Sequence, residues 1–180
     1  EKKGAKLTLT VFALKAAVEA LKQFPNFNAT FDEAGKKVIV KKYYHIGVAV
    51  DTENGLIVPV IKDVDKKSLL ELSVELNEMA EKARKRTLTR EDLQGGTFTI
   101  SNLGGIGGQN FTPIVNHPEV AIMALSRGVK KPMVIKDKIE TRLMMPVGIS
   151  YDHRLIDGAD GARFITALVQ AFQTFKESLL

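Results

Sequence analysis

The sequence predicts an α/β fold in which helices pack on a mixed β-sheet. Several short β-rich segments and three amphipathic segments with helical spacing follow one another along the chain. They do not alternate strictly as strand, helix and strand, so the sheet is expected to be mixed. The chain has 180 residues, of which 44% are hydrophobic and 26% charged. Those values are typical of one soluble globular domain.

Three segments are predicted to be helices, because apolar residues recur in each at helical spacing. The first covers residues 11–23, with Thr10 as its candidate cap. The second follows Ser68 and continues to about residue 86, and Glu71 completes a capping box with Ser68. The third covers residues 159–180. Each helix is expected to bury one apolar stripe against the sheet.

The predicted strands lie between these helices and are separated by turn signals. Asn54-Gly55 is a strong hairpin signal. Pro59 places the strand that contains it at an edge, an end or a bulge. A glycine-rich loop at residues 102–118 is long enough to suggest a functional role. The expected strands are residues 27–31, 37–41, 45–51, 56–61, 96–101, 119–126, 134–136 and 139–151.

Composition limits the classes of function. The net charge of +5 would favour an anionic ligand, but only 7% of residues are aromatic and Trp is absent, so no nucleic acid is expected as a partner. No apolar run approaches the roughly 18 residues of a membrane span, and no signal peptide or membrane partner is expected. The chain has no cysteine, which excludes disulfides, thiolate metal sites and a cysteine nucleophile. No metal site is predicted.

His153 is the histidine that the sequence singles out. It lies in Asp-His-Arg-Leu-Ile-Asp-Gly, directly after an apolar strand and before the third helix. The chain must turn there, which can leave one imidazole nitrogen exposed at the sheet edge. Considered without any relatives, a charged turn in which Arg154 pairs with Asp157 explains the segment equally well. His45 and His117 are expected to be surface or hydrogen-bonded histidines.

The glycine-rich segment at residues 104–108, Gly-Gly-Ile-Gly-Gly, invites a dinucleotide-binding interpretation. The spacing of that motif requires glycine at position 110, where Asn110 stands. No helix pattern follows to receive a pyrophosphate at its N-terminus. The segment is therefore predicted to be a tightly turned or flexible loop.

Three sequence blocks resemble the dihydrolipoamide acyltransferases, which form the catalytic cores of 2-oxo acid dehydrogenase complexes. The segment at residues 152–158 is similar to their D-H-R-x-x-D-G signature, and the chloramphenicol acetyltransferases share a related H-x-x-x-D-G. Leu-Gln-Gly-Gly-Thr-Phe-Thr-Ile-Ser-Asn-Leu-Gly at residues 93–104 resembles the strand that supplies the active-site hydroxyl. Residues 45–60 match a third block. The resemblance implies a chloramphenicol acetyltransferase-like two-layer sandwich, with a mixed sheet packed by helices.

The resemblance also implies an activity. Residues 105–122 and 158–164 are similar to the acetyl-transferring branch, which serves pyruvate dehydrogenase complexes. Members transfer an acetyl group between coenzyme A and a dihydrolipoyl thiol, without an acyl-enzyme. By resemblance, His153 removes the thiol proton and Ser101 donates a hydrogen bond to the thioester oxygen. Asp157 holds the turn and orients His153, with Arg154 in the same ion-pair network. The sequence does not assign the residues that contact coenzyme A.

Assembly is a further implication of the resemblance. Family active sites lie between the subunits of a homotrimer, and trimers build a cage that is expected here to hold 24 subunits. Lipoyl domains, a 2-oxo acid decarboxylase and dihydrolipoamide dehydrogenase are the expected partners. Residues 1–180 are expected to be the acyltransferase domain without the N-terminal part of the family core. The dihydrolipoyl group must then come from a lipoyl domain absent from this chain.

Alternative functions stay open at this point. A core without that N-terminal part could act as a self-assembling scaffold that lacks competent catalysis. An antibiotic O-acetyltransferase is a weaker alternative, because Asp152 stands where that family usually has histidine. The expected location is the cytoplasm, or the mitochondrial matrix if the source is eukaryotic.

Overall fold

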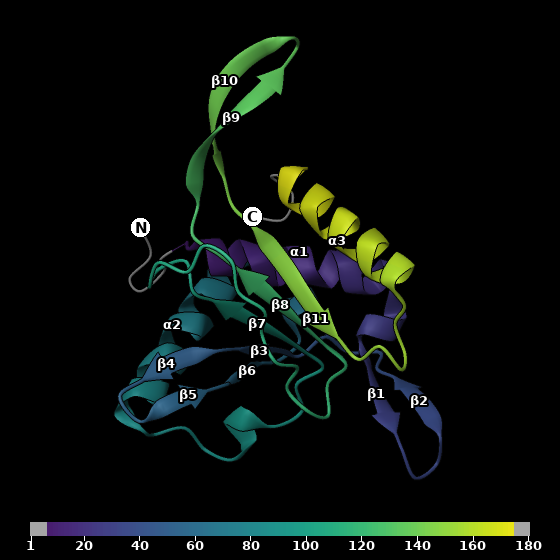
Figure 1. Ribbon diagram of the computed structural model, residues 1–180. Coiled ribbons are helices and arrows are strands. Elements are labelled where there is room, and N and C mark those ends of the chain that lie inside the picture. Colours follow the sequence, from purple (N-terminus) through teal and green to yellow (C-terminus); the bar gives the residue numbers. More distant parts are fainter. Residues whose placement is uncertain (1–6, 175–180) are drawn as a thin grey trace.

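A five-stranded mixed sheet lies at the centre of the computed structural model, which describes residues 7–174 (Figure 1). The strand order is β11-β8-β7-β3-β6. The three central strands are parallel to one another, and the two outer strands are antiparallel to their neighbours. The predicted mixed sheet is therefore confirmed. Its strands are β3 (Ile46–Val48), β6 (Val60–Ile61), β7 (Phe98–Asn102), β8 (Ala121–Leu125) and β11 (Val147–Tyr151).

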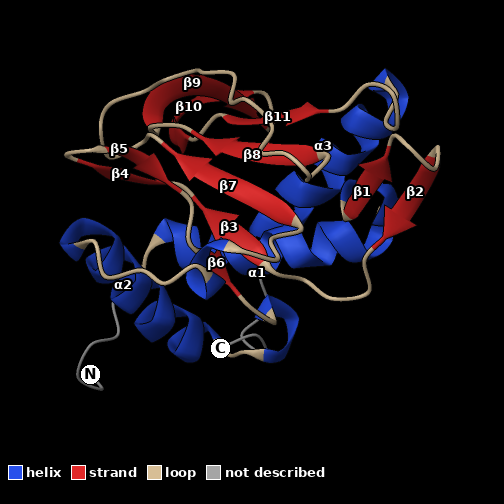
Figure 2. Ribbon diagram, turned by 90° about the horizontal axis from the view of Figure 1, so that it is seen from below, coloured by secondary structure: helices blue, strands red, loops and turns tan. Residues whose placement is uncertain are grey.

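The helices form a second layer on one face of this sheet (Figure 2). They are α1 (Leu9–Gln23), α2 (Leu69–Lys85) and α3 (Gly158–Gln173). α1 lies between α2 and α3 and also contacts β7 of the sheet, so it is buried almost all round. No helix within residues 7–174 is long and apolar enough to cross a membrane. The predicted third helix is confirmed as far as residue 173, and residues 175–180 lie outside the described part of the chain.

Aromatic packing joins α3 to the sheet. Phe164 is fully buried; its ring centroid lies 6.0 Å from that of Phe98 of β7 and 4.0 Å from that of Phe27, on which it stacks. The sequence predicts an apolar stripe through Ile165, Leu168, Val169 and Phe172, and through Phe175, which lies outside the described residues. Leu168 is fully buried and Phe172 packs partly buried against the core, whereas Val169 is 37% exposed. Gly161 allows close packing on the buried face, because a Cβ there would lie 2.8 Å from the ring of Tyr151. The helix therefore approaches β11 most closely at its glycine.

Three two-stranded hairpins are attached to the sandwich: β1 (Ala29–Asp32) with β2 (Lys37–Val40), β4 (Val50–Thr52) with β5 (Gly55–Ile57), and β9 (Val129–Ile135) with β10 (Lys138–Met144). Each of the predicted strands 45–51, 56–61 and 139–151 is divided in two. Pro59 separates β5 from β6, and β6 is an edge strand, as the proline predicts. The β9–β10 hairpin projects well beyond the body (Figure 1).

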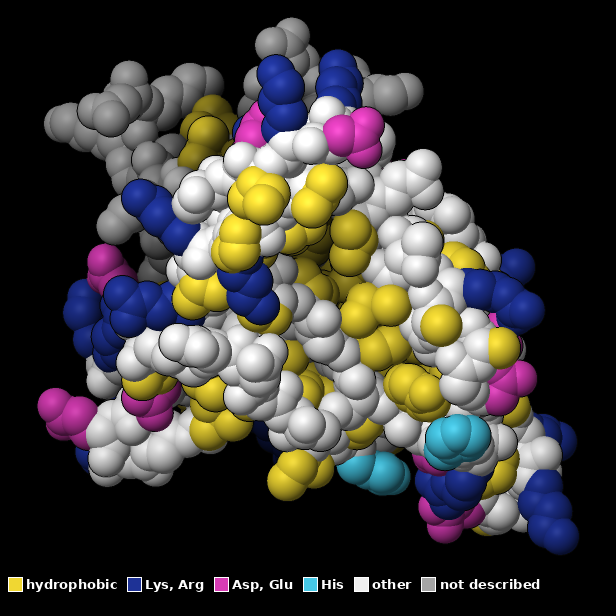
Figure 3. All heavy atoms as spheres, turned by 45° about the horizontal axis from the view of Figure 1, so that its top comes forward, with side chains coloured by type: hydrophobic (Ala, Val, Ile, Leu, Met, Phe, Trp, Pro, Cys, Tyr) yellow, Lys and Arg dark blue, Asp and Glu magenta, His cyan; other side chains and the backbone are white. Residues whose placement is uncertain are grey.

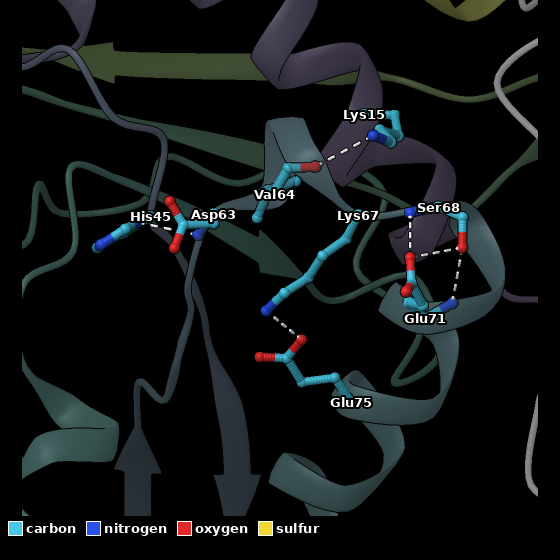
Figure 4. A network of polar contacts seen from close by, with 8 residues as sticks. All are labelled: Lys15, His45, Asp63, Val64, Lys67, Ser68, Glu71 and Glu75. Atoms are coloured by element: carbon cyan, nitrogen blue, oxygen red, sulfur yellow. Dashed lines mark hydrogen bonds and ion pairs between the residues drawn. The ribbon is translucent and has the colours of Figure 1, made fainter.

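The segment that leads into α2 is held by polar contacts (Figure 4). It contains the 3-10 helix η2 (Val64–Lys66). The Lys15 ammonium donates to the carbonyl oxygen of Val64 at 3.1 Å, and burial lowers the pKa of Lys15. The predicted capping box is present: Ser68 Oγ accepts from the Glu71 N–H, and the Glu71 carboxylate accepts from the Ser68 N–H. Two further short 3-10 helices are η1 (Pro25–Phe27) and η3 (Glu91–Leu93).

Candidate active site

The turn after β11 is rigidly attached to the sheet. The Asp152 N–H donates to the Val120 carbonyl oxygen at 2.8 Å, which continues the pairing between β11 and β8. The N–H groups of Leu155 and Ile156 both donate to the Asp152 carbonyl oxygen. Ile156 is 1% exposed and anchors the end of the turn in the core. The predicted turn between the apolar strand and the third helix is therefore confirmed.

His153 lies on this turn with its side chain exposed. Its ring centroid is 5.8 Å from that of Tyr151. The other two histidines differ from it. His45 Nδ1 accepts a hydrogen bond from the Asp63 N–H at 3.0 Å, and His117 precedes a cis proline in the long loop. His153 is thus the histidine at the sheet edge that the sequence singles out.

Arg154 does not pair with Asp157, contrary to the prediction. Its Nε donates to both oxygens of Asp152, at 2.9 and 3.1 Å, and its Nη2 donates to Asp152 Oδ2 at 2.7 Å. Its Nη1 donates to Glu33 Oε1 at 2.6 Å. The guanidinium also lies over the ring of Phe31, 4.8 Å from the centroid. Hydrogen bonds from Arg154 lower the pKa of Asp152.

Asp157 is instead the N-cap residue of α3. Its Oδ1 accepts from the Asp160 N–H at 2.8 Å, which satisfies one of the free amide groups at the start of the helix. The carboxylate therefore binds the start of the helix, whereas Arg154 binds Asp152 and Glu33. Asp157 fixes where the turn ends and where α3 begins.

Ser101 lies near the C-terminal end of β7 and is 9% exposed. Side chains alternate between the two faces of a strand. Phe98 and Ile100 of β7 belong to the core against the helices, so Ser101 is on the helix-free face. The Ser101 hydroxyl has no hydrogen bond to another residue within the described part of the chain. It can therefore donate to a bound group.

Within one chain, Ser101 and His153 lie at opposite ends of the sheet. Ser101 pairs with Ala124, which in turn pairs with Gly148 on β11. Tyr151 lies three residues beyond Gly148, or roughly 10 Å further along the strand, and His153 follows the strand's end. β7 and β11 are also two strand spacings apart, roughly 9–10 Å. One chain therefore does not bring the two side chains to a single thioester.

Glu119 places a buried carboxyl group, which the sequence did not predict, on the same helix-free side of the sheet. Glu119 is 7% exposed, and its Oε2 accepts from the Thr99 hydroxyl at 2.6 Å. Burial raises the pKa of Glu119 to about 7, although hydrogen bonds from Thr99 and Asn116 act in the opposite direction. An acidic residue at the start of an otherwise apolar predicted strand was the available signal. Glu33 and Phe31, the partners of Arg154, carry no local signal.

No group of three or more metal-ligating side chains is found in residues 7–174. Loop 102–118 contains the glycine-rich segment, and the N–H groups of Ile106, Gly107 and Gly108 all donate to the Leu103 carbonyl oxygen. The predicted tight turn is thus confirmed, and no helix follows it. The chemical groups that the described residues place at the two ends of the sheet include the exposed imidazole of His153 and the hydroxyl of Ser101.

Comparisons with known proteins agree with the fold. A solved structure of the dihydrolipoamide acetyltransferase of Azotobacter vinelandii matches with a TM-score of 0.95 and 49% identity, covering 99% of this chain and 74% of that one. A second structure with the same score and coverage is described as the cubic core of the pyruvate dehydrogenase multienzyme complex. A chloramphenicol acetyltransferase matches with a TM-score of 0.56, 16% identity, and coverage of 91% and 77%. This last likeness shows the predicted sandwich fold.

Curated relatives are similar along the whole chain. The dihydrolipoyllysine-residue acetyltransferase component of the pyruvate dehydrogenase complex from Cupriavidus necator is 51% identical over 180 residues, and that from Pseudomonas aeruginosa is 49% identical. Both alignments cover 100% of this chain but only 32% and 33% of the relatives, so the chain spans about a third of their length. The family model of the 2-oxoacid dehydrogenases acyltransferase (catalytic domain) matches residues 1–180. The chain therefore belongs to the catalytic-domain family of the 2-oxoacid dehydrogenase acyltransferases.

Proposed function

We propose that this chain transfers an acetyl group between coenzyme A and the dihydrolipoyl group of a lipoyl domain. The observation that carries the proposal is the exposed imidazole of His153 on a turn that is anchored to the sheet. The relatives at about half identity are acetyltransferase components of pyruvate dehydrogenase complexes, which supports acetyl as the transferred group. The lipoyl domain is a separate partner that presents the second thiol.

The spacing of three residues supports the assignment of roles. The Azotobacter structure was solved to investigate a serine, a histidine and an asparagine in the catalytic mechanism of that enzyme. Its serine precedes the histidine by fifty-two positions, and its asparagine follows by four. Ser101, His153 and Asp157 have the same spacing in this chain. Aspartate thus stands where that enzyme has asparagine, and either side chain can cap a helix.

The chemistry follows from these groups. A free thiol has a pKa of about 8.5, so only a few per cent is thiolate at neutral pH. His153 takes the proton of the attacking thiol, because its exposed imidazole nitrogen can act as a general base. The thiolate attacks the thioester carbonyl, and Ser101 donates a hydrogen bond to the oxygen that gains negative charge. The tetrahedral intermediate then expels the other sulfur as a thiolate, which recovers the proton from His153.

The distance between the two ends of the sheet implies that the site is completed between subunits. We propose a homotrimer in which His153 of one protomer faces Ser101 of the partner subunit. The β9–β10 hairpin supports self-assembly, because Val134, Ile139 and Leu143 are 71%, 78% and 72% exposed on a ribbon that projects from the body. Figure 3, with this side turned forward, shows apolar side chains gathered around a hollow. The cubic core of a relative supports a 24-subunit cage.

The initial rate of acetyl transfer from acetyl-CoA to dihydrolipoamide tests the proposal. His153→Ala should abolish most of the rate while the protein still folds and assembles. Ser101→Ala should lower kcat by about 10²–10³-fold, the usual loss for one oxyanion donor. A rate that survives His153→Ala would refute this base. Assembly without transfer in the unmodified chain would favour the scaffold function.

A further inference from the structure

The two sequence neighbours of His153 contact each other, and these contacts close a ring that includes the His153 backbone. The Arg154 N–H donates to Asp152 Oδ1 at 3.0 Å, and the Arg154 guanidinium returns to the same carboxylate through Nε and Nη2. The backbone of His153 is the part of the ring that joins the two residues. The orientation of the His153 backbone is therefore coupled to the position of the Arg154 guanidinium.

A second set of contacts ties this ring to the β1–β2 hairpin. Glu33, in the turn of that hairpin, accepts from Arg154 Nη1, and Phe31 of β1 lies under the guanidinium plane. The hairpin is itself attached to the body, because Thr30 forms an antiparallel bridge with Glu119, two residues before β8. Two carboxylates and one aromatic ring thus hold the arginine in a single plane. A lysine could not reproduce this arrangement, since it lacks the planar fork.

Within one protomer, the contacts of Arg154 are exposed to solvent, and this exposure limits their effect on stability. The Arg154 side chain is 55% exposed and that of Glu33 69%. Ion pairs this exposed contribute little to stability. A displacement of about 1 Å at a reacting group, however, can reduce a rate by about 10²-fold. The imidazole of His153 is exposed, and the Tyr151 ring is the described aromatic neighbour beside it. Within one protomer, the turn that carries His153 therefore provides most of the positioning of this side chain.

We propose that Arg154 and Glu33 are positioning residues for His153: together with Asp152 and Phe31 they form a clamp that holds the imidazole in the orientation needed to accept the thiol proton. This inference rests on the proposed function, in which His153 is the base. The clamp acts on the rate of proton transfer and leaves substrate binding and folding largely unchanged. It also makes the β1–β2 hairpin part of the active-site structure.

Three variants test the clamp kinetically. Arg154→Lys keeps the charge and loses the fork, so kcat should fall about tenfold or more, with KM for both thiol substrates changed less than about twofold. Glu33→Ala should lower kcat several-fold. Glu33→Gln should restore most of it, because the amide oxygen still accepts from Arg154 Nη1. Arg163→Lys is the matched control, since Arg163 forms an exposed ion pair with Asp160 on α3. The melting temperature and assembly size should stay at the wild-type values in all four.

Hydrogen exchange tests the clamp independently of activity. The amides of Arg154, Leu155 and Ile156 are all bonded to Asp152, so a peptide covering residues 152–156 reports the turn. Exchange there should be faster in Glu33→Ala and Arg154→Lys, and unchanged in Glu33→Gln and Arg163→Lys. Unchanged exchange in Glu33→Ala, or a wild-type kcat in Arg154→Lys, would overturn the inference. An inactive wild type with a loosened turn in Glu33→Ala would contradict the proposed function and leave the clamp supported.

Discussion

Glu119→Gln should change how the stability of the protein depends on pH. The carboxyl group of Glu119 is buried beside Thr99 and next to Gly96, where a Cβ would lie 2.6 Å from Glu119 Oε1. Burial raises its pKa from the ordinary value of 4.5 to about 7. The unfolded chain exposes this group to water and returns its pKa to near 4.5. The folded protein therefore binds a proton that the unfolded chain has already released between these two pH values.

The sign and the size of the pH effect on stability follow from this difference in pKa between the folded and unfolded states. Below pH 4.5 both states are protonated, and the Glu119 contribution to stability is fully present. As the pH rises from 4.5 through about 7, the contribution is lost, because only the unfolded state gains a freely solvated charge. A shift of this size corresponds to about 3 kcal/mol of unfolding free energy, at 1.36 kcal/mol for each pH unit. Glutamine has no proton to lose, and its amide oxygen can still accept from Thr99.

Urea unfolding followed by circular dichroism, at pH 4.5, 6 and 8 and at one protein concentration, measures the effect. The difference in unfolding free energy between Glu119→Gln and wild type should move by about 3 kcal/mol in favour of the variant between the lowest and highest pH. Using the difference cancels the other titrating groups. Glu53→Gln, at an exposed turn position, should show a difference that does not depend on pH. The same pH-independent difference for Glu119→Gln would refute the reasoning.

Two further predictions concern the turn and the hairpin. Asp157→Ala should lower the unfolding free energy by about 1 kcal/mol, because it removes the cap on the Asp160 N–H, whereas Asp157→Asn should retain most of the stability. Thermal unfolding measures both variants. Equal melting temperatures for Asp157→Ala and wild type would count against the capping role. Val134→Lys combined with Ile139→Glu should reduce the assembly size measured by light scattering, with wild-type circular dichroism, because it places charges on an exposed apolar ribbon. An unchanged assembly would show that the β9–β10 hairpin is not part of the interface.

Local sequence signals predicted the elements whose cause is local. The predicted start of α2 is confirmed, because Ser68 and Glu71 satisfy each other's backbone N–H groups within one turn. Pro59 correctly predicted a strand end and an edge strand, since a proline cannot donate to a ladder, and it divides the predicted strand into β5 and β6. The predicted cap of the first helix, Thr10, was wrong. α1 begins at Leu9 with Thr8 in the cap position, and the Thr10 hydroxyl accepts a hydrogen bond from Asn102 of β7 instead.

The sequence by itself determined the α/β class, the family and the candidate residues Ser101, His153 and Asp157, because motifs and periodicity are written in consecutive positions. Only the tertiary structure decided how these residues are related. Strand register places Ser101 level with Gly148, so the hydroxyl and the imidazole of one chain lie apart. Arg154 contacts Glu33, which lies 121 positions away in the sequence, and no local pattern predicts that contact. Contacts between distant segments depend on how whole elements pack, and that packing is a property of the complete fold.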